Sequence, residues 1–546
     1  MKKILLSILA AAALSQSNAQ APYVFENFDI ETGTGGSAPL YLTVCNGKLF
    51  FRATTTASGE ELWMTDGTMA GTQMVKDINP GATGSALQTF KVLNNKLYFT
   101  ANDGTNGNEL WVSDGTSAGT QMVKNINPGA GHSYATPMIV LGNNLLFNAT
   151  DNVNGIELWI TDGTAPGTQL LKDINTGAGT SSPFNFCALS NGKVLFSAAN
   201  NANGNELWIT DGTSVGTQMV TDIVPGATSS SPAGMFAFNN IAYFRATDAT
   251  YGTELWVTDG TAPGTTMIKD INPGAANSGP FRLINYNGKV YFSASDQTAG
   301  NELWVTDGTT MGTVMVKDIN PGFASANIDQ RFVYKNKLYF QATDVTNGAE
   351  LWETDGTSTG TVLVKDIIAG SGGSFPIHFI EYRDKLFFNA AQVAGDRQLF
   401  KSDGTISGTA LIAPPIAPIV DPLGTTAPFV EYDSAIYFLA NYTTTGSELW
   451  SLKDTTAVPN HIGSIGNDLS YSVLPNPNHG SFTLNIENGI AKGCSVAIHD
   501  VTGKLVLNQE ITQKQTTINL PSGAPGTYFL KMQAGDAVDV KQVVVQ

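Results

Sequence analysis

Carboxylates recur at one spacing in this sequence, and their oxygens are ligands that Ca²⁺ prefers. Each of five short loops has an Asp, then a Gly four residues on and a Glu six residues on, as in "DGTNGNE" from Asp103. The candidate ligands are Asp103, Glu109, Asp151, Glu157, Asp248, Glu254, Asp296, Glu302, Asp344 and Glu350. The alternative is a turn that the Asp begins and a Gly at positive φ completes. Each loop offers few carboxylates, and Asn200 replaces the Asp in one copy.

The same glutamates open a repeated octapeptide. "ELWVTDGT" occurs at 254–261 and again at 302–309. Near copies begin at Glu61, Glu109, Glu157, Glu206 and Glu350, and more diverged copies begin at Gln398 and Glu448. Asp-Gly is turn chemistry, because Asp bonds local backbone N–H groups and Gly takes positive φ. The octapeptide therefore predicts the end of one strand and the turn into the next.

A hairpin folded about this turn predicts a cross-strand partner for the Glu. Glu61 then faces Lys76, and the same offset of fifteen residues joins Glu302 to Lys317. Repeat eight has Gln398 and Ala413 at these positions and so loses both charges. A cross-strand ion pair contributes roughly 0.2–1 kcal/mol. The expectation is that these glutamates stabilise the sheet and do not act as catalytic acids.

Other signals for catalysis are sparse. The histidines are scattered and show no metal-ligand spacing: His132, His378, His461, His479 and His499. No nucleophile elbow, phosphate-binding loop or zinc motif is present. Near-identical repeats also disfavour a single active site, since the variation lies in linking loops such as 127–137 and 369–376. We therefore predict no catalytic residues, and no cofactor apart from the Ca²⁺ considered above.

The repeats must be positioned by many short strands. Their aromatic markers fall 48–50 residues apart, at Trp63, Trp111, Trp159, Trp208, Trp256, Trp304, Trp352, Phe400 and Trp450. The second repeat divides into strands at 89–94, 96–102, 108–114 and 120–126. Four antiparallel strands at this period are typical of a propeller blade, with the Trp packed between adjacent sheets.

Closing a ring requires the two ends of the array to meet. The ninth repeat lacks its fourth strand, and 24–39 matches 168–183 in its "DI…TG…G" frame and closing Pro. Residues 24–30 are therefore predicted to supply the outer strand of the last blade. The predicted fold class is all-β: a closed β-propeller of nine four-stranded blades over 20–452, with eight blades as the alternative, and then a small β-sandwich.

The octapeptide resembles the "ELWxTDGTxxGT" repeat of bacterial exported proteins, and the resemblance covers roughly 22–452. Its Asp and Gly are also similar in placement to the Asp-box hairpin of other propellers, which is a folding device, although the spacing differs. The Asp-box is not a catalytic site, and the role of the ELWxTDGT family is mostly unassigned.

The repeat stops after Leu452. A polar linker at 453–470 precedes alternating strands within 471–546, which predict the β-sandwich. This part resembles the type A C-terminal sorting domain of the type IX secretion system. The matching residues are Pro475, Asn476, Pro477, Gly480, Asp500, Gly503, Lys504, Gly526, Tyr528 and Lys541. The resemblance implies transfer across an outer membrane by the type IX secretion machinery, removal of the domain, and attachment to the cell surface, for example to lipopolysaccharide.

The N-terminus points to the same route. Residues 1–19 have a basic start, an apolar centre and small residues before Gln20, which predicts a secretory signal peptide. No later stretch is apolar enough for a transmembrane segment. The net charge of -17 disfavours nucleic acid as a partner. Cys45, Cys187 and Cys494 are too few for a disulfide framework, and we expect them to be buried and unpaired.

Together these patterns predict a protein that is secreted or attached to the outer-membrane surface of a Gram-negative bacterium. The expected function is non-catalytic binding of an extracellular protein or glycan through the axial loops. The alternative is a glycan-degrading hydrolase or lyase on the same fold, because propellers host both classes.

Overall fold

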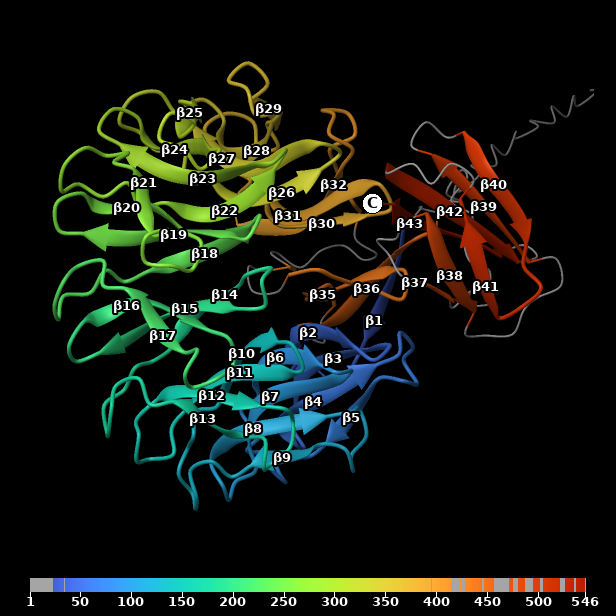
Figure 1. The fold of residues 1–546 in the computed structure, drawn as a ribbon. Coiled ribbons are helices and arrows are strands. Elements are labelled where there is room, and N and C mark those ends of the chain that lie inside the picture. Colours follow the sequence, from blue (N-terminus) through green and yellow to red (C-terminus); the bar gives the residue numbers. More distant parts are fainter. Residues whose placement is uncertain are drawn as a thin grey trace, which may run out of the picture. The chain divides into compact units, whose positions relative to one another are not determined.

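A computed structural model describes most of the chain (Figure 1). The described residues are 23–33, 35–393, 395–413, 422–423, 428–443, 446–455, 471–474, 480–486, 494–500, 504–520, 526–534 and 537–545. All regular elements among them are β-strands. The chain divides into two compact units, 1–455 and 456–546. The predicted signal peptide and most of the predicted linker lie outside the described residues.

The first unit contains nine four-stranded antiparallel sheets, which we number along the chain. Sheet 1 has β2 (Leu40–Cys45), β3 (Lys48–Thr55), β4 (Gly59–Thr65) and β5 (Gln73–Lys76), and sheet 2 has β6 (Gln88–Leu93), β7 (Lys96–Asn102), β8 (Asn108–Ser113) and β9 (Gln121–Lys124). Sheet 3 has β10 (Thr136–Leu141), β11 (Asn144–Ala149), β12 (Glu157–Thr161) and β13 (Gln169–Lys172), and sheet 4 has β14 (Phe184–Ala188), β15 (Val194–Asn200), β16 (Gly204–Thr210) and β17 (Gln218–Thr221).

The next four sheets repeat this order. Sheet 5 has β18 (Ala233–Phe238), β19 (Ile241–Asp248), β20 (Gly252–Thr258) and β21 (Thr266–Lys269), and sheet 6 has β22 (Phe281–Tyr286), β23 (Lys289–Asp296), β24 (Gly300–Thr306) and β25 (Val314–Lys317). Sheet 7 has β26 (Asp329–Tyr334), β27 (Lys337–Asp344), β28 (Gly348–Thr354) and β29 (Val362–Lys365), and sheet 8 has β30 (Ile377–Tyr382), β31 (Lys385–Val393), β32 (Asp396–Ser402) and β33 (Ala410–Leu411). The strands predicted for the second repeat match β6 to β9 to within two residues at every end.

Sheet 9 is built from both ends of the repeat array. It has the order β1-β36-β35-β34, with β34 (Val430–Tyr432), β35 (Ala435–Ala440), β36 (Glu448–Asp454) and β1 (Tyr23–Phe28). β1 pairs antiparallel with β36 from Tyr23 opposite Asp454 to Phe28 opposite Leu449. The predicted pairing of the N-terminal strand with the last repeat is confirmed, although β1 ends two residues before the predicted boundary.

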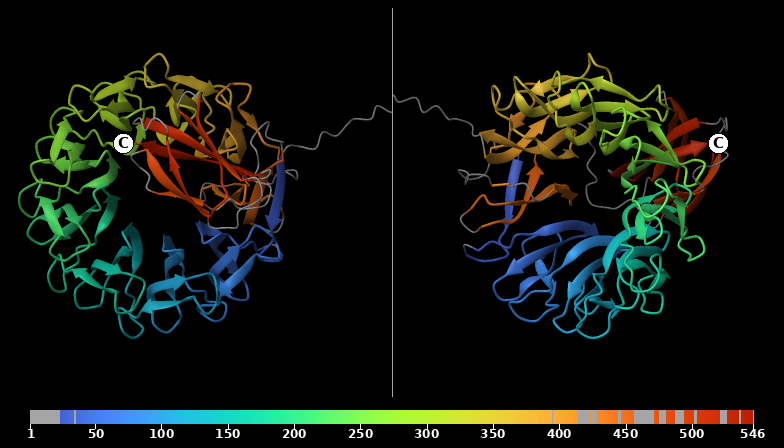
Figure 2. Two further views of the ribbon diagram at one scale, coloured as in Figure 1. Left: turned by 45° about the vertical axis from the view of Figure 1, so that its right-hand side comes forward. Right: turned by 90° about the vertical axis from the view of Figure 1, so that its left-hand side faces the viewer.

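Apolar side chains gather between consecutive sheets. One cluster joins Phe50 and Leu62 of sheet 1 to Phe99 and Trp111 of sheet 2, and equivalent clusters join each later sheet to the next. A further cluster joins sheet 1 to sheet 9. The repeat tryptophans therefore pack between adjacent sheets, as predicted. Figure 2 shows these sheets following one another around a common centre.

The second unit contains two antiparallel sheets. One has the order β37-β38-β41, with β37 (Tyr471–Leu474), β38 (Ser481–Ile486) and β41 (Gln515–Asn519). The other has the order β40-β39-β42-β43, with β39 (Ser495–Asp500), β40 (Leu505–Glu510), β42 (Gly526–Ala534) and β43 (Ala537–Val545). Both sheets contribute to one apolar core, in which Leu484 and Ile518 of the first meet Val496 and Leu530 of the second.

Candidate functional site

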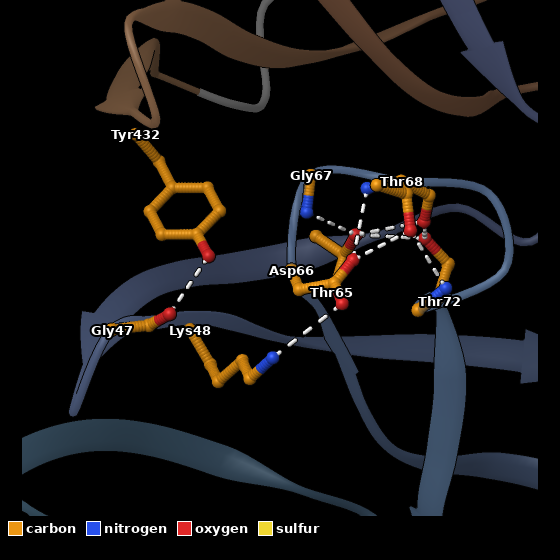
Figure 3. Close-up of polar contacts among 9 residues, drawn as sticks. Gly47, Lys48, Thr65, Asp66, Gly67, Thr68, Thr72 and Tyr432 are labelled. Carbon is orange, nitrogen blue, oxygen red and sulfur yellow. Dashed lines mark hydrogen bonds and ion pairs between the residues drawn. The ribbon is translucent and has the colours of Figure 1, made fainter. Parts of the chain in front are cut away.

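The octapeptide forms a compact turn in which its polar residues bond to one another (Figure 3). Asp66 Oδ1 accepts hydrogen bonds from the backbone N–H of Thr68 at 3.0 Å and from the Thr68 hydroxyl at 2.7 Å. The Thr72 hydroxyl bonds the Thr68 carbonyl and the Thr65 hydroxyl, each at 2.8 Å. A Cβ at Gly71 would lie 1.9 Å from Asp66 Oδ1, which explains the second Gly of the motif. The bonds from Thr68 lower the pKa of Asp66. The Asp66 carboxylate is thus hydrogen-bonded within its own turn.

Each turn also rests on the preceding sheet. A Cβ at Gly163 would lie 2.1 Å from the Tyr98 hydroxyl, and one at Gly356 would lie 2.4 Å from the Tyr291 hydroxyl. The same approach joins the two ends of the array, because Gly67 of sheet 1 lies against Tyr437 of sheet 9. Beside it, the Tyr432 hydroxyl donates to the Gly47 carbonyl at 2.8 Å (Figure 3).

The predicted ion pair between Glu61 and Lys76 is wrong. The register is Leu62 opposite Lys76 and Trp63 opposite Met74, so a β-bulge on the outer strand shifts the Lys by one position. The same shift separates Glu302 from Lys317. The Lys76 ammonium instead donates to the Thr120 carbonyl of the next sheet at 2.7 Å. Lys124, Lys172, Lys269, Lys317 and Lys365 make the equivalent bond to the next sheet.

The glutamates bind the segment that links one sheet to the next. Glu157 accepts hydrogen bonds from the Ile174 backbone N–H at 2.8 Å, the Ser181 backbone N–H at 2.9 Å and the Ser181 hydroxyl at 2.6 Å. We call this arrangement the latch. The Ile lies seventeen residues after the Glu in all seven internal latches, at Ile78, Ile126, Ile174, Ile223, Ile271, Ile319 and Ile367. At the terminal latch, Glu448 is bound by Ile30 and Ser37 from the other end of the unit.

Every latch glutamate is fully buried, and burial raises its pKa. For Glu61 and Glu302 burial raises the pKa to about 7. The expectation that the glutamates are structural holds, but the partner is backbone and not Lys. The signal for it is present in the sequence, because a Ser follows most of these glutamates after twenty-four residues, as Ser85 follows Glu61.

The calcium candidates have protein partners in each loop. Asp103 Oδ1 accepts the backbone N–H groups of Thr105 at 2.9 Å and Asn106 at 2.7 Å, as the alternative of an Asp-led turn requires. Glu109 serves its latch with Ile126 at 2.9 Å. Among the described residues, no group of three or more His, Cys, Asp or Glu side chains is placed to hold a metal. Calcium binding by these loops stays a prediction.

Each latch holds a short segment whose backbone is constant and whose side chains vary. We define the display segment as five residues: the position of the latch Ser and the four residues that follow it. These segments are 37–41, 85–89, 133–137, 181–185, 230–234, 278–282, 326–330 and 374–378. The second residue has positive φ in all eight and the fifth in seven, the exception being Pro137. Non-glycine residues at positive φ are uncommon and concentrate where function requires them.

Each display segment from sheet 2 to sheet 8 is contacted by a residue of the preceding sheet, which belongs either to that sheet's second strand or to its own display segment. The contacts run from Arg52 to the Leu87 carbonyl, Thr100 to the Ala135 carbonyl, Asn148 to the Pro183 carbonyl, Asn185 to the Pro232 carbonyl, Arg245 to the Phe281 ring, Arg282 to Asp329, and the His378 N–H to Gln330. We call this row of segments the belt. The linking loops singled out from the sequence, 127–137 and 369–376, contribute Tyr134 and Phe375, which are 53% and 48% exposed.

In the second unit, part of the predicted sorting signal is described. Asp500 and Lys504 close a turn, in which the Lys504 backbone N–H donates to Asp500 Oδ1 at 3.1 Å. Tyr528 is buried in the core, Gly526 begins β42, and Lys541 pairs with Leu530 in the adjacent strand. Gly480 immediately precedes β38. Pro475, Asn476, Pro477 and Gly503 lie outside the described residues.

Residues 472–546 match the family model described as a secretion system C-terminal sorting domain. The chain therefore carries a sorting tail that directs it to the type IX secretion system, and the protein is exported to the cell surface or secreted. In the described part of the chain, no helix has the length and hydropathy needed to cross a bilayer. No curated protein is similar enough to be counted as a relative.

Several solved structures are similar at low identity. PorZ, a bacterial surface component of the type IX secretion system of Porphyromonas gingivalis, has 12% identity and a TM-score of 0.18, with 93% of this chain and 86% of that chain covered. The β-propeller domain of the trilobed protease from Pyrococcus furiosus has 11% identity and a TM-score of 0.30, with 61% and 99% covered. Puromycin hydrolase has 12% identity and a TM-score of 0.33, with 65% of this chain and 58% of that chain covered. At these values the similarities say nothing about substrate or activity.

Proposed function

We propose that the first unit is a closed nine-bladed β-propeller that binds an extracellular protein or glycan without catalysing a reaction, and that the second unit is a β-sandwich. Nine sheets sharing nine apolar cores support the closure, because an open row of nine sheets would share eight. The N-terminal strand in sheet 9 supports it as well.

The belt is the observation that carries the binding function. The motif residues Glu, Asp and Lys are engaged in the latch, the turn and the link between sheets, as Glu157, Asp66 and Lys76 illustrate. The side chains that differ between repeats are presented by display segments of one backbone form. A constant frame that displays different side chains along a continuous row suits recognition of an extended ligand.

A glycan-degrading hydrolase or lyase on the same fold is the second candidate, supported by the buried glutamates with raised pKa. A general acid has such a pKa, as Glu302 does at about 7. However, Glu302 accepts three backbone N–H bonds, from Ile319, Asn320 and Ala326, and its side chain is 0% exposed. A substrate cannot reach that carboxylate without opening the latch.

Glycan-array and extracellular-protein binding screens on the full chain, followed by activity assays on each ligand found, test the function. Binding without turnover is expected. Replacing 127–137 with the equivalent eleven residues 272–282 should change the affinity and leave the melting temperature unchanged, because the swap exchanges displayed side chains on one frame. Cleavage of a bound glycan that is lost with Glu302→Gln would establish the enzyme instead.

We also propose that 1–19 is removed as a signal peptide, that the tail is cleaved within 453–470, and that the mature protein is attached to surface lipopolysaccharide. The sorting-domain match supports this route. Deleting 471–546 should leave a folded first unit in the periplasm. Cell fractionation with mass spectrometry measures this, and surface-exposed truncated protein, or a mature form that still ends at Gln546, would contradict it.

A further inference from the structure

Arginine is rare in this chain and is concentrated on the belt. The sequence has six arginines against a net charge of -17. Three of them meet at one display segment, 278–282. Arg282 is its last residue, and Arg245 and Arg331 contact it from the neighbouring sheets. The Arg245 and Arg282 guanidinium carbons lie 5.9 and 5.2 Å from the centre of the Phe281 ring. One carboxylate, Asp329, pairs with Arg282. This group is therefore locally positive within an acidic protein.

The group combines a solvent-exposed aromatic ring with a solvent-exposed positive charge. Phe281 is 44% exposed, and the side chain of Arg282 is 43% exposed. Arg282 has a backbone φ of +51°, which residues other than glycine rarely adopt. The fold therefore holds this residue in a strained backbone conformation. Arg331 donates to the Phe281 carbonyl at 3.2 Å and to the Arg282 carbonyl, and these two bonds hold the backbone of the segment. The site is preformed, because its backbone is held by side chains of the neighbouring sheet.

From this cluster we infer that the belt binds an anionic polysaccharide, with Phe281 packing against a sugar ring and Arg245 and Arg282 contacting its acidic group. The inference rests on the proposed binding function. The C–H face of a pyranose is apolar enough to pack on an aromatic ring, and guanidinium forks match a carboxylate or sulfate. A ligand anion also offsets the repulsion between the Arg282 and Arg331 guanidinium groups, which Asp329 balances in part.

The backbone chemistry favours a glycan over an acidic peptide. A peptide that adds as a strand needs free backbone carbonyls. The carbonyls of Phe281 and Arg282 already accept hydrogen bonds from Arg331. Elsewhere on the belt, Leu87, Pro183 and Pro232 carbonyls are likewise taken by side chains of adjacent sheets. Side chains are thus the groups left to contact a ligand, as sugar recognition requires.

The test measures binding of the full chain to polygalacturonate and dextran sulfate, with neutral dextran and polyglutamate as comparisons. We expect binding to at least one anionic polysaccharide, weaker at high salt because exposed charges are screened. The two anionic probes distinguish a carboxylate from a sulfate ligand. Arg282→Gln should weaken binding about 10-fold or more, as loss of a charge-assisted hydrogen bond predicts. Phe281→Ala should weaken it to a similar degree.

Matched controls lie elsewhere on the same unit. Lys193→Gln removes one exposed positive charge from a hairpin tip, and Phe323→Ala removes an aromatic ring that is 83% exposed. Both should bind like the unaltered chain. If Arg282→Gln fails to fold, as a melting curve would show, Arg245→Gln replaces it.

Several results would overturn the inference. These are no binding to either anionic probe, equal binding by the Arg282 and control variants, or preference for polyglutamate. The last result would assign the belt to an acidic protein partner. Binding to neutral glycans unaffected by these substitutions would leave the proposed function standing and end the inference, whereas turnover of a bound glycan would end the proposed function itself.

Discussion

The outer strands of sheets 3 and 9 occupy the same place in the repeat but are held differently. β13 follows β12 through the turn at Asp162 and pairs with it at three positions around a bulge, and its Lys172 ammonium donates to the Ser214 carbonyl of sheet 4 at 3.3 Å. β1 comes from the far end of the sequence and pairs with β36 over six residues without a bulge. At the position of Lys172 it has Phe28, which is 0% exposed.

The difference between β13 and β1 shows what holds an outer strand that does not follow its partner directly in the chain. A strand that follows its partner through a short turn is brought to it at little entropic cost, whereas β1 must be brought to β36 from the other end of the repeat array. Longer pairing and a buried ring, with Phe28 and Tyr437 centroids 5.7 Å apart, offset that cost. The latch is shared by both sites, with Ser37 bound to Glu448 as Ser181 is to Glu157.

The largest expected effect is at the terminal strand. Phe28→Ala should lower the free energy of unfolding by about 3–5 kcal/mol, because it empties a fully buried site. Lys172→Ala, the matched internal change, should cost about 1 kcal/mol or less, since it removes one partly exposed hydrogen bond. Urea denaturation of both variants measures the difference. Equal losses would show that the two strands are held alike.

Stability should fall as pH rises from 5 to 8. Burial raises the folded-state pKa of Glu302 to about 7, above the value of about 4.5 in the unfolded chain, so the folded state binds more protons between these values. This shift corresponds to about 3 kcal/mol for one group at its upper limit. Denaturation at several pH values should therefore show a flatter profile for Glu302→Gln. A profile that keeps its full slope would assign the pH dependence to other groups.

The latch serine should contribute less than the buried ring. Ser37→Ala should cost about 1 kcal/mol, as the loss of one hydrogen bond to the Glu448 carboxylate predicts. The chain offers the reverse change, because Ala326 stands where the other latches have Ser. Ala326→Ser should raise the melting temperature. Destabilisation by this Ser would mean that the latch of Glu302 has no room for a hydroxyl.

The smallest expected effect is the coupling between Glu302 and Lys317. Their side chains bind different groups, the Ile319 N–H and the Thr361 carbonyl. Replacing both by Thr should cost the sum of the single changes to within about 0.5 kcal/mol. A double-mutant cycle measures this, and a larger coupling would restore the ion pair that the sequence alone suggests.

The strands and the turn were accessible to prediction because their information is local. The Trp spacing and the strand missing from the ninth repeat led to the sheets and to β1. The burial of Cys45, Cys187 and Cys494 was also foreseen and is confirmed. The Glu partner was missed because counting residues across a hairpin assumes a regular ladder. One bulged residue near Val75 moves Lys76 out of register with Glu61.

The sequence by itself thus determined the period, the strands, the chemistry of the "TDGT" turn and the origin of the outer strand in sheet 9. Tertiary structure decided which groups the buried glutamates bind and which variable side chains share a surface. Arg245 and Arg331 are 36 and 50 positions from Phe281, and their contacts with it depend on how neighbouring sheets pack. Turn chemistry acts within a few residues and is written in sequence, whereas packing between sheets joins residues that no local pattern connects.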